Sequence, residues 1–416
     1  MSPQSSVLGP QKGTQSEARG PRPEDSRLEL ATLLLLSPLF LFPPTGRLFL
    51  TPILLLPLPW LISLAKGGEP LPRTALNGSI FVLLLMVGVS LYATYDVLFS
   101  ASKVLGVVFG IAVFFAIARS ARLNLALDLF VLAGAALAAL GILGTNWMSK
   151  WPAVARVTSH LPAVIRGVPG QSEGFQPNAI AGALVMFVPL QFALAIKASG
   201  WRRIAYAAMF LFTAGTLLLT QSRGGYLSIA IAFAAWGIWS GKRSRVVTIA
   251  LILLVLAAAI PLRHRLSTGA GFTSDVEGRT ELWSRAITMI GDFPFTGIGM
   301  NTFRKIMPVM YPAFLTPPSY DIAHAHNHLL QAALDLGVPG LIAYLALWFG
   351  AAALLFSGYR KARAQRTIAG GMAAGMLAYF LFGTVDAIAL GAKVGIFFWV
   401  ALGLIVAMYR DAELTA

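Results

Sequence analysis

Long, uninterrupted runs of apolar residues constrain the fold of this chain more than any other feature. Residues 104–118 and 246–262, for example, contain no charged side chain. A helix rises about 1.5 Å per residue, so a run of about 20 residues matches the bilayer's apolar core, which is about 30 Å thick. A helix also satisfies its own backbone groups, which lipid cannot do. The chain is therefore predicted to be an all-α, polytopic integral membrane protein.

Twelve candidate transmembrane spans follow from these runs. They cover residues 30–43, 48–65, 79–94, 104–118, 125–144, 178–196, 204–220, 225–240, 246–262, 340–356, 368–385 and 394–409. The first is predicted to be an uncleaved span, because Phe42-Pro43-Pro44 follows it where a signal peptide would have small residues. Residues 1–28 are rich in Ser, Pro, Gly and charge and are predicted to be disordered.

The basic residues predict the orientation of these spans. Most lie in segments on one side, whereas the four short connections on the other side carry one each: Arg47, Lys103, Arg223 and Lys393. By the positive-inside rule, both termini are then cytoplasmic. The predicted parts are a disordered cytoplasmic N-terminus (1–28), spans one to nine (29–262), a large loop with short helices on the outer side (263–339), and spans ten to twelve with a cytoplasmic C-terminus (340–416).

Charge and cysteine content exclude several classes of function. A net charge of +15 would suggest a nucleic-acid partner in a soluble protein. Here the basic residues lie between apolar runs, so topology explains them and no nucleic-acid partner is expected. The chain has no cysteine, which excludes disulfides, thiolate metal sites and a cysteine nucleophile.

The long outer segment 263–326 is predicted to contain a helix that begins with Thr280 as its cap and stops at Asp292. Its apolar face would comprise Leu282, Ala286 and Met289. A second short helix is predicted to follow Asn327 and to stop at Gly337, with Pro339 in the first turn of span ten.

Two arginines of the outer face are candidates for binding an anion. Arg223 lies between apolar runs in Gln221-Ser222-Arg223-Gly224-Gly225, where a guanidinium can bind phosphate and the glycines let a ligand approach. An interfacial arginine that touches lipid headgroups is an equal alternative. Arg279 lies at the predicted start of the loop helix, where the dipole favours anions. The alternative for Arg279 is a solvated residue at a helix end.

Weaker signals come from three other residues. Arg263 and Arg265 flank a histidine where span nine emerges, and anchoring at lipid headgroups is the favoured explanation for them. Asn178 follows Gln176-Pro177 and is either a helix cap, which is favoured, or a polar contact to a ligand.

Three of the five histidines fall in Ala323-His324-Ala325-His326-Asn327-His328. A neutral imidazole is the usual general base near pH 7. The alternatives are a zinc site, with Asp321 as a fourth ligand, and a purely structural role. Charged residues in or beside the spans are few, namely Asp128 near one end of span five and Asp386 at the end of span eleven. Proton- or ion-coupled transporters usually carry such groups at the midplane, so a transporter is the less favoured alternative to an enzyme.

These motifs resemble those of the O-antigen ligase and polymerase superfamily, whose members act on polyprenyl-diphosphate-linked glycans. The resemblance extends from Asn178 to Tyr344. The motifs are Ser222-Arg223-Gly224-Gly225, Gly278-Arg279 with Trp283, Asp292-Phe293-Pro294 before Gly297-Ile298-Gly299, and His326-Asn327 before Gly337-Val338-Pro339-Gly340. Met300-Asn301 departs from the glycine-rich continuation that the superfamily has after Gly299.

The resemblance implies an O-antigen ligase in the bacterial inner membrane, with its active site facing the periplasm. The implied donor is O-antigen on undecaprenyl diphosphate, the acceptor is a sugar hydroxyl of lipid A–core, and membrane lipids surround the protein. No cofactor and no metal are expected. A polymerase of O-antigen or exopolysaccharide from the same superfamily is the alternative.

In this interpretation, Arg223 and Arg279 stabilise the diphosphate leaving group, and His326 removes the acceptor's proton, with inversion at the anomeric carbon. Further contacts to substrate are predicted from Asn178, Gln221, Arg263, Arg265, His324, Asn327 and His328.

Overall fold

The computed structural model describes residues 23–42, 51–67, 69, 71–147, 151–162, 164–166, 174–267, 271–315 and 321–414, except the side chains of 23–27, 255–276 and 364. The regular structure in this part of the chain is helical, with one isolated bridge between Thr145 and Phe175 in addition. The first helices are α1 (Pro23–Leu41), α2 (Thr51–Leu55), α3 (Leu58–Ala65), α4 (Asn77–Ala93), α5 (Val97–Arg119), α6 (Leu123–Gly144), α7 (Pro152–Thr158), α8 (Pro177–Leu184) and α9 (Phe187–Lys197). The remaining helices are α10 (Gly200–Leu219), α11 (Arg223–Trp239), α12 (Lys242–Ser267), α13 (Gly271–Asp292), α14 (Phe303–Met310), α15 (His328–Lys361), α16 (Arg366–Gly383) and α17 (Ile396–Leu414), with short 3-10 turns at Arg363–Gln365 and Lys393–Gly395.

The all-α class is confirmed, and each predicted span overlaps a helix or a pair of consecutive short helices. Within the described residues, six helical segments are long and apolar enough to cross a membrane: Val97–Arg119, Leu123–Gly144, Pro177–Lys197, Gly200–Leu219, His328–Lys361 and Lys393–Leu414. Shorter apolar helices cover Leu28–Leu41, Thr51–Ala65 and Asn77–Ala93. The protein is therefore a multi-pass membrane protein, and the number twelve stays a prediction.

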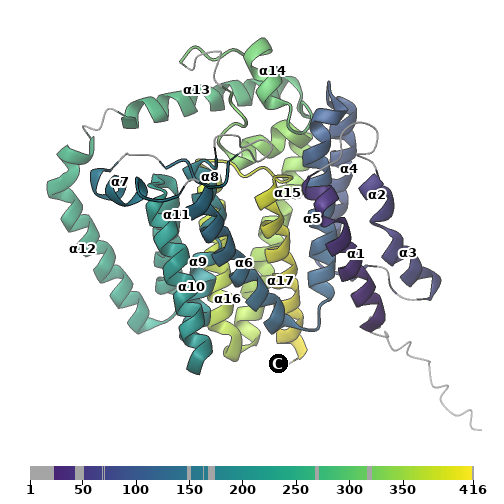
Figure 1. The fold of residues 1–416 in the computed structure, drawn as a ribbon, viewed down its shortest axis with the longest axis horizontal. Coiled ribbons are helices and arrows are strands. Elements are labelled where there is room, and N and C mark those ends of the chain that lie inside the picture. The colour runs from purple at the N-terminus through teal and green to yellow at the C-terminus, as the bar shows by residue number, and fades with distance from the viewer. Residues whose placement is uncertain are drawn as a thin grey trace, which may run out of the picture.

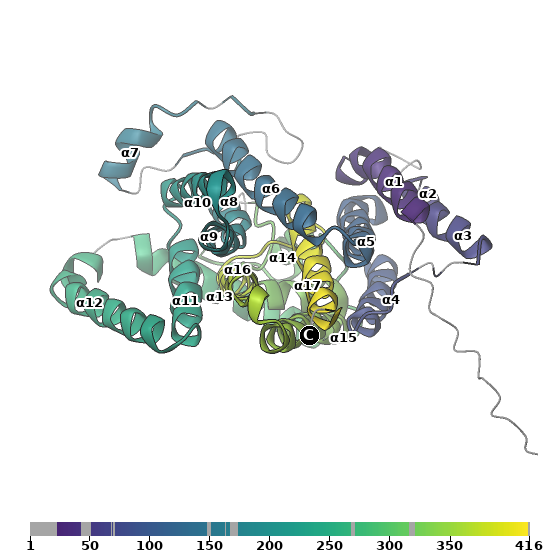
Figure 2. The same cartoon turned by 90° about the horizontal axis from the view of Figure 1, so that it is seen from below.

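Helices α16 and α17 lie in the middle of the bundle, with the other long helices around them (Figures 1 and 2). Glycines allow the close approach of neighbouring backbones. A Cβ at Gly375 of α16 would lie 2.3 Å from the Met186 carbonyl oxygen, and one at Gly403 of α17 would lie 2.9 Å from that of Phe114. Small residues at helix contacts are typical of membrane proteins, because association there depends on packing.

Helix α13 lies across one end of the bundle, with α14 beside it (Figure 1). We call this the α13 end. The apolar face of α13 was predicted correctly, since Leu282, Ala286 and Met289 are buried. They belong to a separate small core that also contains Ile298, Phe303, Met307, Ile322, Ala325 and Leu334. The predicted cap at Thr280 is wrong, because α13 begins at Gly271. Gly278 lies inside the helix, where glycine costs only about 1 kcal/mol relative to alanine.

The predicted break at Gly337 is confirmed. Gly337 has non-helical backbone angles (φ 68°, ψ 176°) within α15, and Pro339 follows in the continuing helix. A Cβ at Gly337 would lie 2.5 Å from the Phe295 carbonyl oxygen, so the loop before α14 packs against this break. The short first part of α15 therefore belongs to the α13 end, and the rest runs through the bundle.

The predicted disorder of residues 1–28 is wrong for its last residues, because α1 begins at Pro23. Proline suits the first turn of a helix, where its missing N–H is not needed. Further along α1, Glu29 accepts a hydrogen bond from Trp60 Nε1 (2.8 Å) and lies 3.8 Å from Arg119 Nε of α5. These contacts fix α1 against its neighbours.

Candidate active site

His326 lies in the segment before α15 and faces the loop between α16 and α17. Its Nδ1 lies 3.0 Å from Oδ1 of Asp386. A carboxylate only accepts hydrogen bonds, so Nδ1 carries the proton and Nε2 keeps a free lone pair. Burial disfavours the charge of Asp386, but the hydrogen bond from His326 and the positive charge of His326 and His324 in their protonated forms outweigh it and lower the pKa of Asp386. The pair is therefore an ionised carboxylate that orients an imidazole.

The ring of His324 packs against the ring of His326, with the ring centroids 4.4 Å apart. His324 Nδ1 accepts a hydrogen bond from the His326 backbone N–H (3.2 Å), and its Nε2 lies 3.9 Å from Asp386 Oδ1. Burial lowers the pKa of His324 to about 4, Asp386 opposes this shift, and the positive charges of His326 when it is protonated, of Lys103 and of Arg304 add to it. His324 is therefore neutral at pH 7.

For the zinc alternative, the structure brings together a different set of possible ligands from the predicted one. Among the described residues, the group that could hold a metal ion is His324, His326 and Asp386, whose ligand atoms lie within 4.8 Å of one another. Asp321, considered as a fourth ligand, instead accepts a hydrogen bond from Arg304 Nε (3.0 Å). His328 is directed elsewhere.

Asn327 and His328 hold the histidine segment in place. The Asn327 side chain caps α15 by accepting hydrogen bonds from Leu329 N (2.9 Å) and Leu330 N (3.1 Å), as expected of a helix start. Its amide also donates to the Thr384 carbonyl oxygen (3.1 Å), two residues before Asp386. His328 is buried, and its Nδ1 lies 2.9 Å from the Tyr344 hydroxyl. Its ring packs against three aromatic rings, those of Tyr344, Trp348 and Phe380.

Gln331 and Asp335 of α15 support the same segment, and the sequence analysis did not find them. Gln331 Oε1 accepts a hydrogen bond from Ala325 N (3.0 Å), between the two histidines, and its Nε2 donates to Asp335 Oδ1 (2.8 Å). Asp335 also accepts from the Asn301 backbone. Their spacing of four residues puts both on one helix face next to the histidine motif, and that was the available signal.

Three non-glycine residues in the described part of the chain have positive φ: Gln221 (52°), Asn301 (67°) and His326 (49°). Such angles cost free energy and persist where the surroundings impose them, often at functional sites. Gln221 precedes the Arg223 turn, Asn301 follows the Gly299 turn, and His326 is the proposed base. The strained backbone therefore coincides with the motifs that the sequence singled out.

Arg223 is the first residue of α11, so its main chain belongs to a helix N-terminus, where the dipole favours anions. Ser222 caps this helix by accepting from Gly225 N (3.3 Å). A Cβ at Gly224 would lie 2.9 Å from Val385 Cγ2, so the turn packs against the residue before Asp386. The structure thereby brings the Arg223 turn and the His326–Asp386 pair to the same loop.

Gln221 and Asn178 have structural surroundings. Gln221 is buried, and its Oε1 accepts a hydrogen bond from Trp151 N (2.7 Å), which ties the start of α7 to this turn. Asn178 is partly buried and is not the cap of α8, because Gln176 occupies that position and Asn178 lies within the helix. The proline at the first helical position displaces the cap by two residues. The predicted substrate contacts of both remain predictions.

Arg279 lies in the middle of α13 and is partly buried. The argument from a helix-start dipole is therefore wrong for this residue. Three residues further along, Leu282 joins the core that contains Ala325, between the two histidines. Arg263 and Arg265 lie in α12, and their side chains are outside the described residues.

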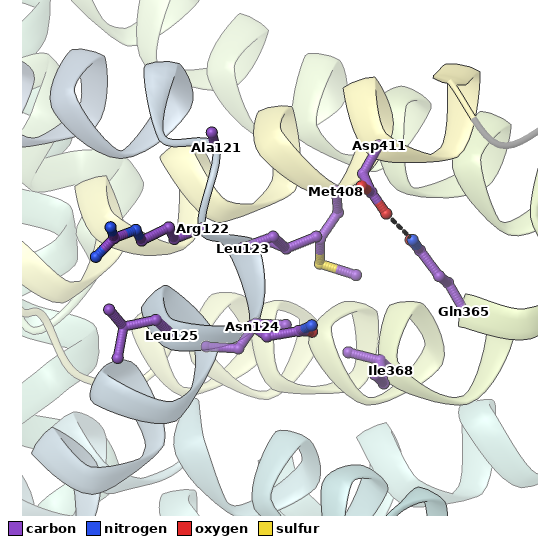
Figure 3. Close-up of a pocket in the computed structure, with 10 residues that line it drawn as sticks. Ala121, Arg122, Leu123, Asn124, Leu125, Gln365, Ile368, Met408 and Asp411 are labelled. Atoms are coloured by element: carbon purple, nitrogen blue, oxygen red, sulfur yellow. Dashed lines mark hydrogen bonds between the residues drawn. The ribbon is translucent and has the colours of Figure 1, made fainter. Parts of the chain in front are cut away.

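A cavity of about 270 Å³ lies at the other end of the bundle (Figure 3). It is lined where α6 and α16 begin and α17 ends, and Gln365 and Asp411 form a hydrogen bond at its edge. Gln365 precedes α16, whereas Asp386 follows it, so the length of α16 separates this cavity from the histidines.

The fold and the site define a multi-pass membrane protein that gathers a histidine–aspartate pair and an arginine turn at one end. Residues 208–345 match the family model described as O-antigen ligase, so the chain carries a domain of this family. The match includes Arg223, Arg279 and His326, whereas Asp386 and α5 lie outside it. No curated protein matches the chain. The match of this segment indicates a glycan transferase, either a ligase or a polymerase, with lipid-linked glycan substrates.

Proposed function

We propose that the protein transfers O-antigen from undecaprenyl diphosphate to a sugar hydroxyl of lipid A–core, on the periplasmic face of the inner membrane. The observation that supports this most is the hydrogen bond of 3.0 Å between His326 Nδ1 and Asp386 Oδ1. It leaves Nε2 of an oriented imidazole available to accept a proton, which is what activation of a weakly nucleophilic hydroxyl requires.

In the proposed reaction, His326 Nε2 removes the hydroxyl proton as the acceptor oxygen attacks the anomeric carbon of the donor. The new glycosidic bond forms on the face opposite the diphosphate, and the bond between the anomeric carbon and the diphosphate oxygen breaks. The configuration therefore inverts. Asp386 stabilises the imidazolium that His326 becomes, and Asn327 positions the segment through Thr384. His326 then returns its proton to solvent or to the released diphosphate.

Negative charge grows on the diphosphate as this bond breaks, and a cationic group must stabilise it. Arg223 is suited to this role because it combines a planar guanidinium with a helix N-terminus and lies in the turn that contacts Val385. Arg279 of α13 is proposed to contribute from the helix that crosses this end. With these cations the reaction needs no divalent metal.

The same residues would also serve a polymerase, whose acceptor is the sugar of another lipid-linked glycan. The two functions differ in the acceptor alone, so the acceptor must be identified by experiment. A transporter, the rival from another class, would leave the oriented His326–Asp386 pair without a role.

Analysis of lipopolysaccharide from a deletion strain separates these functions. We expect loss of all long-chain bands, together with accumulation of undecaprenyl-linked polymer. Caps of a single repeat unit would instead indicate a polymerase. Purified protein should keep its transfer activity in EDTA, and activity that is abolished by chelation and restored by one metal would contradict the metal-independent mechanism.

A further inference from the structure

Lys103 lies on α5, in its second turn, and its side chain is partly buried. Among the described residues, no hydrogen bond or ion pair to its ammonium group is found, although its charge acts on Asp335, Arg304, Lys393 and His324. The side chain is only partly buried, so the ammonium group stays accessible to a ligand. A ligand that supplies a negative charge would form a charge-assisted hydrogen bond with it.

The backbone of Lys103 contacts the loop that carries Asp386. A Cβ at Gly391 would lie 1.9 Å from the Lys103 carbonyl oxygen, so only glycine fits there. The start of the same loop, at Val385, contacts Gly224 in the Arg223 turn. In both cartoon views α11 and α5 lie on different sides of α16 and α17 (Figures 1 and 2). The Arg223 turn and the start of α5, which carries Lys103, therefore reach the loop of Asp386 from two sides.

The nearby acids do not neutralise Lys103. Asp335 is the acid that attracts the Lys103 ammonium group. Its carboxylate already accepts hydrogen bonds from Gln331 Nε2 and from the Asn301 backbone. Asp321 is paired with Arg304, and Lys393 adds a further positive charge. The α5 side of the site thus has an excess of positive charge beside a neutral His324.

We propose that Lys103 binds an anionic group of the acceptor, a phosphate or a carboxylate, on the α5 side of the histidine–aspartate pair. This inference rests on the proposed function, because a transferase needs separate places for two substrates and Arg223 occupies the donor side. The ammonium group orients the acceptor so that its hydroxyl meets His326 Nε2, while the donor diphosphate lies toward α11.

The test compares Lys103→Met, which keeps the length of the side chain, with Lys103→Arg and with a control, Lys305→Met. Lys305 is an exposed lysine on α14, 5.9 Å from the Phe99 ring of α5, so the control removes the same charge from the same region. KM values for purified lipid A–core and for undecaprenyl-diphosphate-linked glycan are measured in detergent, together with melting temperatures.

For Lys103→Met we expect KM for lipid A–core to rise about tenfold or more, the loss of one charge-assisted hydrogen bond. KM for the donor and the melting temperature should stay unchanged, and Lys103→Arg should recover part of the loss. If the anion is a phosphate, dephosphorylated lipid A–core should bind wild type as weakly as the variant. If that treatment has no effect while the variant still loses affinity, the anion is a carboxylate.

Unchanged KM for lipid A–core, or a rise in KM for the donor instead, would overturn the inference while the ligase function stands. A fall in melting temperature with both KM values unchanged would mark Lys103 as structural. Wild-type protein that binds the donor but does not transfer to lipid A–core would refute the proposed function itself, and the inference with it. The wild-type measurement therefore separates the two failures.

Discussion

The two ends of the helix bundle use charge in different ways. At the end away from α13, ion pairs link neighbouring helices: Arg202 lies 2.7 Å from Asp128, and Lys361 lies 2.8 Å from Glu413. At the α13 end, Arg304 pairs with Asp321, but Lys103 has no such partner among the described residues and His326 keeps a free ring nitrogen. Paired charges fix helix ends, whereas unmatched ones are suited to binding a charged substrate.

Backbone strain is distributed in the same way. The positive-φ residues Gln221, Asn301 and His326 all lie in loops of the α13 end. The other end has its own polar contacts, such as Gln365 to Asp411, but no non-glycine residue with positive φ among those described. The positive-φ residues and the His326–Asp386 pair together distinguish the α13 end, where the reaction is proposed, from the other end.

The largest expected effect is at His326. His326→Ala should reduce transfer about 10²- to 10⁴-fold, because the proposed general base is lost. Binding of the lipid-linked donor should survive, since the arginines hold the diphosphate. His324→Ala and His328→Ala should do less harm, and Asp386→Asn should fall between. Turnover and donor binding of these variants in detergent provide the check. Normal turnover in His326→Ala with an inactive His324→Ala would move the base to His324.

The next effect should be at the arginines. Arg223→Lys keeps the charge but loses the planar fork, so a substantial defect is expected despite the conservative change. Arg223→Ala and Arg279→Ala should each lower the rate about 10²- to 10³-fold, the typical loss of one donor that stabilises developing charge. Single-turnover rates at saturating donor measure this. Wild-type rates in both alanine variants would remove the proposed leaving-group site.

Much of the architecture could be predicted from the sequence, because it depends on local signals. Apolar runs gave the positions of the helices, Asn327 supplied a cap, and Gly337 with Pro339 marked a break that the structure contains. The start of α13 was missed because Thr280 was taken as the cap, whereas the helix begins at Gly271. To count the spans, the position of the membrane surfaces along each helix must be known, and neither hydropathy nor helix length alone determines it.

The site was only partly predictable, since its key contacts join distant parts of the chain. His326 and Asp386 are 60 positions apart. Asp386 had been noted as one of few acids within the spans, but nothing local ties it to the histidine motif. Lys103 had been noted only for topology, and its approach to the same loop depends on the contact with Gly391. Such pairings follow from helix packing, which residue spacing does not encode.

A smaller effect is expected on folding stability at acidic pH, through the protonation of His324. Its pKa is lowered to about 4 in the folded protein, chiefly by burial, from an ordinary value of 6.5. The unfolded chain therefore binds the proton more readily, so this contribution to stability is complete above pH 6.5 and is lost as pH falls toward 4. At pH 5 the loss should be about 2 kcal/mol.

Melting temperatures of wild type and His324→Asn at pH 7 and pH 5 measure this loss. Asparagine can keep the hydrogen bond from His326 N but does not titrate. Wild type should therefore lose more stability than the variant between the two pH values. Equal losses would show that His324 is not held neutral by burial.

The smallest effect should come from the opposite end, and it tests the comparison directly. Arg202 hydrogen-bonds to both oxygens of Asp128 and to the Tyr206 hydroxyl, so its environment is well ordered, yet nearly half of its side chain is exposed. Exposed ion pairs contribute little, because water and salt screen them. Arg202→Gln should therefore leave both KM values and the transfer rate unchanged and lower the melting temperature by about a few degrees at most.

Arg223→Lys, which does not remove a charge, should be far more harmful to transfer. If Arg202→Gln impaired transfer as strongly as Arg223→Lys, charge pairing would not distinguish the two ends, and the assignment of the reaction to the α13 end would lose this support.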